Sequence, residues 1–340
     1  MTPLVSVVIP AYNAAMYLKG CVDSIIEQTM GDWEIIIVDD GSSDSTGMIC
    51  REYTVSDSRI RHISQSNQGV SIARNNGIKE AKGQYVMFVD ADDLLPKRSL
   101  ETFYQACLKY PDADIVRGEY VAIDSFGNKL FTSNKKVFNK SKVYNIEVNL
   151  FINKYINHEF FLWLMWIKKS RIDDVWFTDG RSYMEDAEFL FKAFRNVNSC
   201  IYIPNVIYYY RKYEGSASSE INDKKLKDIV SCVLTISKLR FDQSKLTIKT
   251  IDESVNYCWQ IIFNNLAKLN EIERNDVIER LKLRFYASKS IIGSTFVDID
   301  LQDFIEKSTK KFIDNFLLRR NKKNKLIFLP KFVSKLKEKF

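Results

Sequence analysis

The sequence contains no apolar run long enough to cross a bilayer. Its best candidate, residues 160–167, is far shorter than the stretch of about 20 residues that a membrane-spanning helix needs. The first residues also lack the charged segment, apolar core and small-residue cleavage site of a secretory signal. We therefore expect a protein that is not integral to a membrane and that stays in the cytoplasm.

Cysteine and histidine are too scattered to suggest a metal cluster or a disulfide framework. The six cysteines lie far apart with no C-x-x-C pair, and they form no cluster with His62 or His158. Two glycine-rich phosphate loops, G-x-G-x-x-G and G-x-x-x-x-G-K-[ST], are also missing. The cysteines are expected to be free and mostly buried, and any phosphate must be held in another way.

Positive charge is concentrated at one end of the chain. Residues 301–340 contain twelve Lys and Arg against four Asp and Glu, so the other 300 residues carry only −1 of the net charge of +7. A basic cluster at residues 319–325 precedes Pro330, which can start a helix. One face of that helix would be apolar, with Phe332, Val333, Leu336 and Phe340. A basic amphipathic segment suits an anionic membrane surface; the alternatives are a solvated helix end and a tail that binds nucleic acid.

The pattern along the chain predicts one α/β domain and a helical module. Residues 1–110 alternate apolar runs, at 5–9, 34–38, 59–63 and 85–89, with helical spacing, which is typical of a layer with a largely parallel sheet. Residues 111–219 contain shorter strands, such as 114–117 and 206–210, and are interpreted as the second half of the same domain. Residues 220–340 show helical spacing, for example at 226–239 and 255–269, and predict a helical C-terminal module.

Polar clusters follow three of the four predicted strands, namely Pro10-Ala-Tyr-Asn13, Asp39-Asp-Gly-Ser42 and Asp90-Ala-Asp-Asp93. An open parallel sheet binds ligands outside the carboxyl ends of its strands. Asp90 and Asp92 are two residues apart, so their side chains point to the same side of an extended segment. Such a pair suits Mg²⁺ or Mn²⁺ bridged to substrate phosphates, although a D-x-D alone is also common in solvated turns.

Five segments taken together resemble family 2 glycosyltransferases of the GT-A fold, of the type that builds bacterial cell-surface polysaccharides. They are Val5-Ser-Val-Val-Ile-Pro-Ala-Tyr-Asn13, Ile36-Ile-Val-Asp-Asp-Gly-Ser-Ser-Asp44, Asn67-Gln-Gly-Val-Ser-Ile-Ala-Arg-Asn-Asn-Gly77, Phe88-Val-Asp-Ala-Asp-Asp93 and Met184-Glu-Asp186. The resemblance covers residues 4–219. It implies a Rossmann-like, mixed and mostly parallel sheet flanked by helices, with residues 1–110 binding the nucleotide-sugar and 111–219 binding the acceptor.

The resemblance also implies which residues hold the nucleotide. It assigns this role to Pro10, Ala11, Tyr12, Asn13, Asp39, Gln68, Gly69, Arg74, Asp90, Ala91 and Arg211. Asp39 would bond the base, usually uracil, whose N3–H a carboxylate can accept. Arg74 would face the phosphates or Asp39, because its planar fork pairs with either; the alternative is a structural ion pair. Some family members have a histidine at or near Tyr213, which puts the phosphate contacts of Arg211 in doubt.

By the same resemblance, Asp92 is the principal metal ligand together with Asp90, and Asp186 is the general base that takes the proton of the acceptor hydroxyl. Glu185 has the alternative role of compensating a helix dipole. The aromatic stretch around Trp163 and Trp166 could form a platform for the acceptor sugar, although core packing is the more common role of buried aromatics.

The sequence thus predicts an inverting glycosyltransferase that uses Mn²⁺ or Mg²⁺ to move one sugar from a UDP-sugar to a hydroxyl of a lipid-linked glycan acceptor. The basic tail would hold it at the inner face of the plasma membrane, and no nucleic-acid partner is expected. A non-catalytic scaffold subunit is the alternative, but Asp92 and Asp186 are both present. A nucleotidyltransferase would usually have a glycine- and lysine-rich loop, and a processive synthase would have membrane spans and a Q-x-x-R-W motif.

Overall fold

A computed structural model describes residues 2–132, 144–213, 223–239 and 246–266. The chain divides into two compact units, one made of residues 1–220 and 243–246 and the other of residues 221–242 and 247–340. The basic amphipathic tail predicted at residues 319–340 lies outside the described residues.

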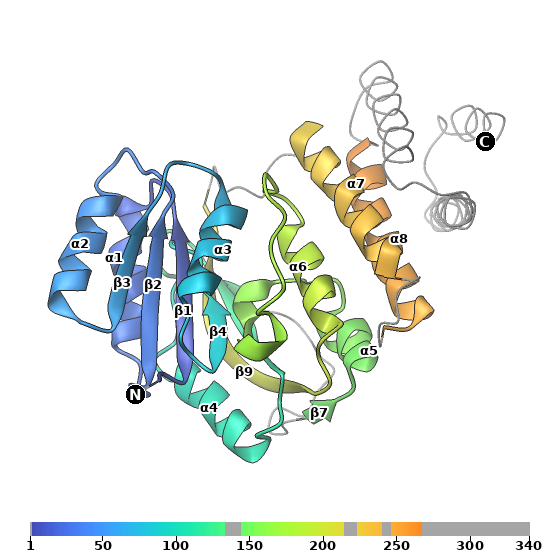
Figure 1. The fold of residues 1–340 in the computed structure, drawn as a ribbon, viewed down its shortest axis with the longest axis horizontal. Helices are drawn as coiled ribbons and strands as arrows, with labels where there is room; N and C mark the ends of the chain where they lie inside the picture. Colours follow the sequence, from blue (N-terminus) through green and yellow to red (C-terminus); the bar gives the residue numbers. More distant parts are fainter. Residues whose placement is uncertain (1, 133–143, 214–222, 240–245, 267–340) are drawn as a thin grey trace. The chain divides into compact units, whose positions relative to one another are not determined.

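Four parallel strands form the first half of the sheet. The elements in chain order are β1 (Val5–Ala11), α1 (Ala15–Ile26), β2 (Trp33–Asp39), α2 (Thr46–Ser56), β3 (Ile60–Ser64), α3 (Val70–Glu80) and β4 (Tyr85–Phe88). The strands lie in the order β3-β2-β1-β4. Because the chain passes to the other side of β1 to form β4, α3 covers one face while α1 and α2 pack together on the opposite face (Figure 1). The predicted α/β fold class is confirmed.

Apolar runs form these strands because helices cover both faces of the sheet. Val7, Ile36 and Met87 are completely buried, as expected of strands with no solvent-facing side. Helix α3 approaches β1 closely at Gly77, where a Cβ atom would lie 2.2 Å from Cγ1 of Val8. This close packing fixes the height of α3, which carries Arg74, relative to the ends of the strands.

The second half of the domain extends the sheet beyond β4. Its elements are α4 (Ser99–Lys109), β5 (Ile115–Ile123), β6 (Lys129–Thr132), β7 (Tyr144–Ile146), α5 (Val148–Leu150), β8 (Met165–Lys168), α6 (Glu185–Phe194) and β9 (Cys200–Arg211). Within the described residues, nine strands form one sheet in the order β3-β2-β1-β4-β8-β5-β9-β7, with β6 paired to β5. Strand β8 is antiparallel to β4 and β5, and β5 is parallel to β9. The sheet is therefore mixed.

The aromatic stretch at residues 160–167 lies in the core. The indole ring of Trp166 is fully buried and stacks on Phe103 with 5.0 Å between ring centres. Trp163 is 4% exposed and stacks on Tyr208 at 4.3 Å. Of the two interpretations of these tryptophans, the structure favours core packing over a sugar platform.

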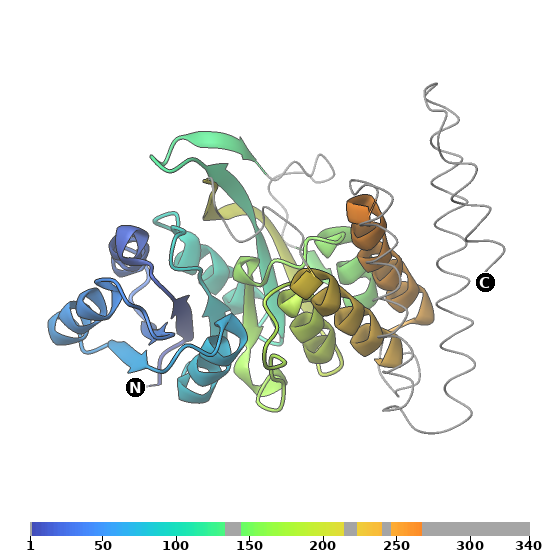
Figure 2. The same ribbon diagram turned by 90° about the horizontal axis from the view of Figure 1, so that it is seen from above.

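Strand β5 continues well beyond the predicted residues 114–117 and forms a hairpin with β6. Its register against β9 shifts between Arg117 and Tyr120, which allows one long strand to pair with β8 at its start and with β6 at its end. The turn at residues 124–128 is closed by backbone hydrogen bonds between Asp124 and Asn128 and between Gly127 and Asp124. Figure 2 shows this blue-green hairpin extending away from the sheet.

The second unit contains two described helices, α7 (Asp223–Lys238) and α8 (Ile248–Leu266), which pack against each other. Their apolar residues, among them Ile229, Val233, Ile251 and Val255, are buried. Helical spacing predicted both helices. Among the described helices, none combines the length and apolar character that a bilayer crossing requires.

Candidate active site

The polar residues that follow β1, β2 and β4 meet at the carboxyl edge of the parallel strands. The loops after β1 and β2 are tied together, since the backbone N–H of Asn13 donates to Oγ of Ser42 and the N–H of Ser43 donates to Oδ1 of Asn13. Asn13 has a φ of 48°, a conformation that asparagine tolerates. Tyr12, the residue before Asn13, is 55% exposed. Its ring is thus available as a wall for a planar ligand.

Asp39 is the last residue of β2 and Asp40 follows it, and the two carboxylates have different partners. Asp39 is buried, accepts the N–H of Ser42, and has Oδ2 3.9 Å from Nε2 of His62. Burial lowers the pKa of His62, against the opposing pull of Asp39. Gly41 has a φ of 74°, and a Cβ atom there would lie 2.7 Å from the backbone N of Asn67. Only glycine fits this turn, which brings the β2 loop close to the loop before α3.

The carboxylate of Asp40 organises the loop before α3. It accepts a hydrogen bond from the side-chain amide of Gln65 at 2.7 Å, and from the backbone N–H groups of Gln68 and Gly69 at 2.8 Å each. Gly69 has a φ of 90°, and the space that a Cβ would enter is open. The loop is therefore rigid on its inner side and accessible on its outer side, where a nucleoside could approach.

Arg74 links the two halves of the domain. Its Nη1 contacts Oδ1 of Asp186 at 2.8 Å and Oε1 of Glu185 at 3.0 Å, and its Nη2 contacts Oδ1 of Asp90 at 3.2 Å. The side chain is only 5% exposed. Burial alone would lower the pKa of Arg74, but Asp186, Asp90 and Glu185 together raise it, so the guanidinium stays charged. The sequence left phosphates, Asp39 or a structural ion pair open as partners of Arg74. In the structure, Arg74 contacts carboxylates of the β4 loop and of the start of α6, and Asp39 is not among the contacts found in the described residues.

Asp186 stands at the start of α6. Met184 precedes the helix with a φ of 59°, a left-handed conformation that is uncommon for such a residue. The carboxylate of Asp186 also accepts the N–H of Leu162 at 3.4 Å and remains 19% exposed. Burial raises the pKa of Asp186 to about 7, with Arg74 opposing the rise and Glu185 adding to it. A carboxyl group with such a pKa can exchange a proton near neutral pH.

Asp90, Asp92 and Asp93 lie in one loop after β4 but differ in their surroundings. Asp93 is buried and accepts hydrogen bonds from Tyr208 Oη at 2.8 Å and from the N–H of Arg211 at 2.6 Å. Asp92 accepts one from Tyr213 Oη at 2.9 Å. Burial, followed by the charge of Asp90, raises the pKa of Asp92. Asp93 thus supports the loop, whereas Asp90 and Asp92 form a pair in which the charge of Asp90 disfavours ionisation of Asp92.

This pair fits a divalent cation of the Mg²⁺ or Mn²⁺ type. The side chain of Asp90 is 32% exposed. Burial and then the charge of Asp90 raise the pKa of Asp92, and a bound cation would stabilise the ionised pair. In the part of the chain that the structure describes, no three His, Cys, Asp or Glu side chains form a ready-made metal site. That is compatible with a cation held by one or two protein carboxylates and completed by substrate phosphates.

The Arg211 side chain donates hydrogen bonds to backbone carbonyls and is mostly shielded from solvent. Its Nε donates to the carbonyl of Asp92 at 2.7 Å, and its Nη1 donates to the carbonyls of Asp124 and Ser125 at 3.2 and 2.8 Å. The guanidinium also lies 4.9 Å from the ring centre of Tyr17. These contacts connect the β4 loop to the turn of the β5–β6 hairpin, and leave Arg211 only 8% exposed.

Sequence reasoning singled out Tyr213 but assigned no partner to it, and it gave no role to Tyr17 or Tyr208. Tyr208 Oη accepts the N–H of Asp90 and donates to Asp93, and the ring of Tyr213 lies 5.4 Å from that of Tyr17. The run of tyrosines at the end of β9 was the available signal. It gave no indication of which phenol would reach which carboxylate, because that depends on the register between β9 and β5.

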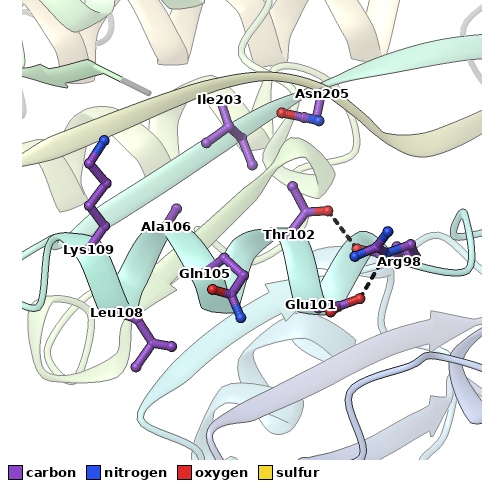
Figure 3. A pocket seen from close by; sticks show the side chains of 9 residues that line it. All are labelled: Arg98, Glu101, Thr102, Gln105, Ala106, Leu108, Lys109, Ile203 and Asn205. Atoms are coloured by element: carbon purple, nitrogen blue, oxygen red, sulfur yellow. Dashed lines mark hydrogen bonds and ion pairs between the residues drawn. The ribbon is translucent and has the colours of Figure 1, made fainter. Parts of the chain in front are cut away.

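A surface hollow between α4 and β9 shares no residue with this site. Its lining includes Leu108, Lys109, Ile203 and Asn205, and the ion pair of Arg98 and Glu101 lies at one end (Figure 3). Its side chains include no paired carboxylates and no group whose chemistry resembles that at the strand ends. We therefore place the candidate active site at the carboxyl edge of the sheet.

Proteins of similar sequence are glycosyltransferases. The family model described as Glycosyl transferase family 2 matches residues 6–165. Glycosyltransferase GlyG of Streptococcus pneumoniae serotype 4 is 32% identical over 310 residues, which cover 85% of this chain and 98% of GlyG.

Two solved structures share the fold. S. aureus TarS 1–349 in complex with UDP-GlcNAc has a TM-score of 0.65 at 20% identity, over 81% of this chain and 78% of that chain. Mannosyltransferase PcManGT of Pyrobaculum calidifontis, in complex with GDP-Man and Mn²⁺, has a TM-score of 0.52 at 16% identity, over 92% of this chain and 88% of that chain. At these identities the likeness concerns the fold alone.

Proposed function

The chain belongs to glycosyl transferase family 2, and from this premise we propose that it transfers a single sugar from a UDP-sugar to a hydroxyl of a glycan acceptor, with inversion at the anomeric carbon. The observation that carries the proposal is the Arg74 network, in which one buried guanidinium contacts both Asp90 and Asp186. Asp90, which is suited to bind a nucleotide-bound cation, and Asp186, which is suited to accept a proton, are thereby held in fixed positions by the same side chain.

Asp186 acts as the general base. The acceptor oxygen attacks the anomeric carbon while its proton passes to the Asp186 carboxylate, whose raised pKa of about 7 allows both forms near neutral pH. The bond from the same carbon to the diphosphate oxygen breaks, and its electron pair leaves with UDP. Attack and departure take place on opposite faces of the sugar, so the configuration inverts.

The donor lies along the carboxyl edge. Asp39 accepts the N3–H of uracil, the exposed ring of Tyr12 covers the base, and the open side of Gly69 admits the nucleoside. Asp92 and Asp90 would hold Mn²⁺ or Mg²⁺, which when bound offsets negative charge on the leaving diphosphate. TarS in complex with UDP-GlcNAc and PcManGT in complex with GDP-Man and Mn²⁺ are precedents for nucleotide-sugars on this fold.

The acceptor is a lipid-linked oligosaccharide of surface polysaccharide biosynthesis, as the family resemblance implies, and the basic tail binds the anionic inner face of the plasma membrane. The tail lies outside the described residues, so this part rests on the charge pattern of residues 301–340. Removing residues 317–340 should reduce sedimentation of the protein with anionic liposomes. Unchanged sedimentation would eliminate the tail as an anchor.

The transfer itself is tested by UDP release from a panel of UDP-sugars, with GDP- and CMP-sugars as controls, in the presence of Mn²⁺, Mg²⁺ or EDTA. Asp92→Ala should abolish the UDP release that depends on the metal, and Asp186→Asn should lower it strongly. Asp173→Asn is a matched control, because that carboxylate is 56% exposed and pairs with Lys169 in an i,i+4 contact on the surface. UDP binding by calorimetry without turnover of any sugar would instead favour a scaffold subunit, and absence of binding would refute both.

A further inference from the structure

The hairpin of β5 and β6 exposes a cluster of apolar side chains. Phe126 in its turn is 89% exposed, and Leu130 and Phe131 on β6 are 52% and 46% exposed. We call these three residues the tip cluster. All four residues of β6 are exposed, and the hairpin extends away from the sheet in Figure 2. Exposed apolar clusters of this kind mark interaction sites.

Positive charge accompanies the tip cluster. Lys129 lies on the same strand, and Nζ of Lys212 is 4.8 Å from the ring centre of Phe131. The described residues that follow in this segment, 125–132, include Lys129 and no acidic residue. The carboxylate of Asp124, just before them, accepts hydrogen bonds from two backbone N–H groups of the turn. The charge of this surface therefore complements an anionic partner.

The distribution of apolar groups separates a bilayer from a protein partner. Leu130 and Phe131 are adjacent in a strand, so they point to opposite faces of it. A groove on a protein would cover one of these faces, whereas the headgroup region of a bilayer surrounds a projecting hairpin on both. In a two-fold contact with a second copy of the chain, the same lysines would face each other.

We propose that the β5–β6 hairpin docks on an anionic bilayer surface. The tip cluster enters the headgroup region, and Lys129 and Lys212 contact lipid phosphates. Any backbone group of β6 that has no partner in the protein needs water or a headgroup as its partner. Hydrocarbon offers neither, which limits the hairpin to the interface.

Docking of the hairpin would bring the active site to the membrane. Arg211 donates to the carbonyls of Asp124 and Ser125 at the start of the turn and to that of Asp92 in the β4 loop. The turn and the backbone of the loop that carries the paired carboxylates therefore share one guanidinium. A lipid-linked acceptor held at the bilayer surface would lie beside the residues that use it; this consequence rests on the proposed function, whereas the docking itself does not.

The test compares the full chain with two single variants in sedimentation with vesicles of equal parts phosphatidylglycerol and phosphatidylcholine. Phe126→Asp removes an apolar side chain and adds a negative charge, and should weaken vesicle binding about tenfold or more. Val55→Asp is the matched control, since Val55 is 90% exposed near the end of α2. It should bind as the parent chain does.

A labelled cysteine reports on insertion directly. The six native cysteines are all buried, so a thiol introduced by Phe126→Cys can be labelled selectively with nitrobenzoxadiazole. Its emission should shift to the blue on addition of the anionic vesicles, and that of labelled Val55→Cys should not. The basic tail is the same in every variant, so it cannot produce this difference.

Three results would overturn the proposal: no binding of the parent chain to these vesicles, equal binding by Phe126→Asp, or no emission shift at position 126. Self-association that depends on Phe126, measured by sedimentation velocity, would assign the surface to a second copy instead. UDP binding by calorimetry is measured on the same samples. Absence of UDP binding by the parent chain would contradict the proposed transfer while leaving the vesicle result valid.

Discussion

Asp186 can take a proton from an acceptor hydroxyl only after it has lost its own, so the rate of transfer should follow the ionisation of this carboxyl group. Burial raises its pKa to about 7, against the pull of Arg74 and with repulsion from Glu185 and Asp90. Because the deprotonated form is the active one, kcat/KM should rise with pH through that value and then level off. Well below the pKa, each pH unit should cost about a factor of ten in kcat/KM.

The assay is UDP release at donor concentrations below KM, with the divalent cation that supports turnover, over about two pH units on either side of the pKa. Under these conditions kcat/KM reports the ionisation of the free enzyme. Asp173→Asn should keep the acidic limb unchanged, since its carboxylate is exposed and pairs with Lys169. Asp186→Asn should lower the rate at every pH and remove the limb.

A flat profile in the parent protein would refute the assignment of Asp186 as the base. So would an acidic limb that persists in Asp186→Asn, because the limb would then belong to another group. Asp92 is the obvious alternative, since burial and Asp90 raise its pKa as well. A bound cation would suppress that titration, so the two assignments differ in how the limb responds to metal concentration.

Three substitutions test the supporting contacts. Arg74→Lys keeps the charge but loses at least one charge-assisted hydrogen bond, worth about 1.5–3 kcal/mol, so kcat/KM should fall about tenfold to a hundredfold with an unchanged circular dichroism spectrum; full activity would contradict this. Asp40→Asn places an amide against N–H donors such as that of Gly69 and should weaken UDP binding in calorimetry about tenfold, whereas equal affinity would show that the loop does not need the carboxylate. Tyr213→Phe removes the donor to Asp92 and should weaken Mn²⁺ binding with UDP, followed by electron paramagnetic resonance, about tenfold; unchanged affinity would leave Tyr213 a packing role only.

The sequence predicted the location of those candidate site residues that directly follow a strand. Asp39 and Asp90 follow continuous apolar runs, and the carboxyl ends of parallel strands necessarily meet at one edge. The sequence was also able to identify helix α3 as the carrier of Arg74. It could not select the partners of Arg74, because Asp186 lies 112 residues away and no local periodicity encodes such a contact.

The second half of the domain was less predictable because its strands are irregular. Strand β5 exceeds the predicted residues 114–117, since a register shift after Arg117 lets it change neighbours from β8 to β6. Strand β6 itself is exposed on both faces, so it lacks the alternation of apolar and polar residues by which a half-buried strand is recognised. The feature that carries the proposed membrane contact is thus one that a sequence pattern does not reveal.

The charges around Arg74 do not balance within its network. Four carboxylates, those of Asp90, Asp92, Glu185 and Asp186, lie along one loop and one helix start, and a single buried guanidinium contacts three of them. Burial raises the pKa of both Asp92 and Asp186, and neighbouring carboxylates raise both further. A divalent cation at Asp92 and a proton at Asp186 are the two positive charges that would offset this repulsion, and the proposed transfer would use both. A purely structural cluster would avoid this excess of negative charge, whereas the proposed reaction can use it.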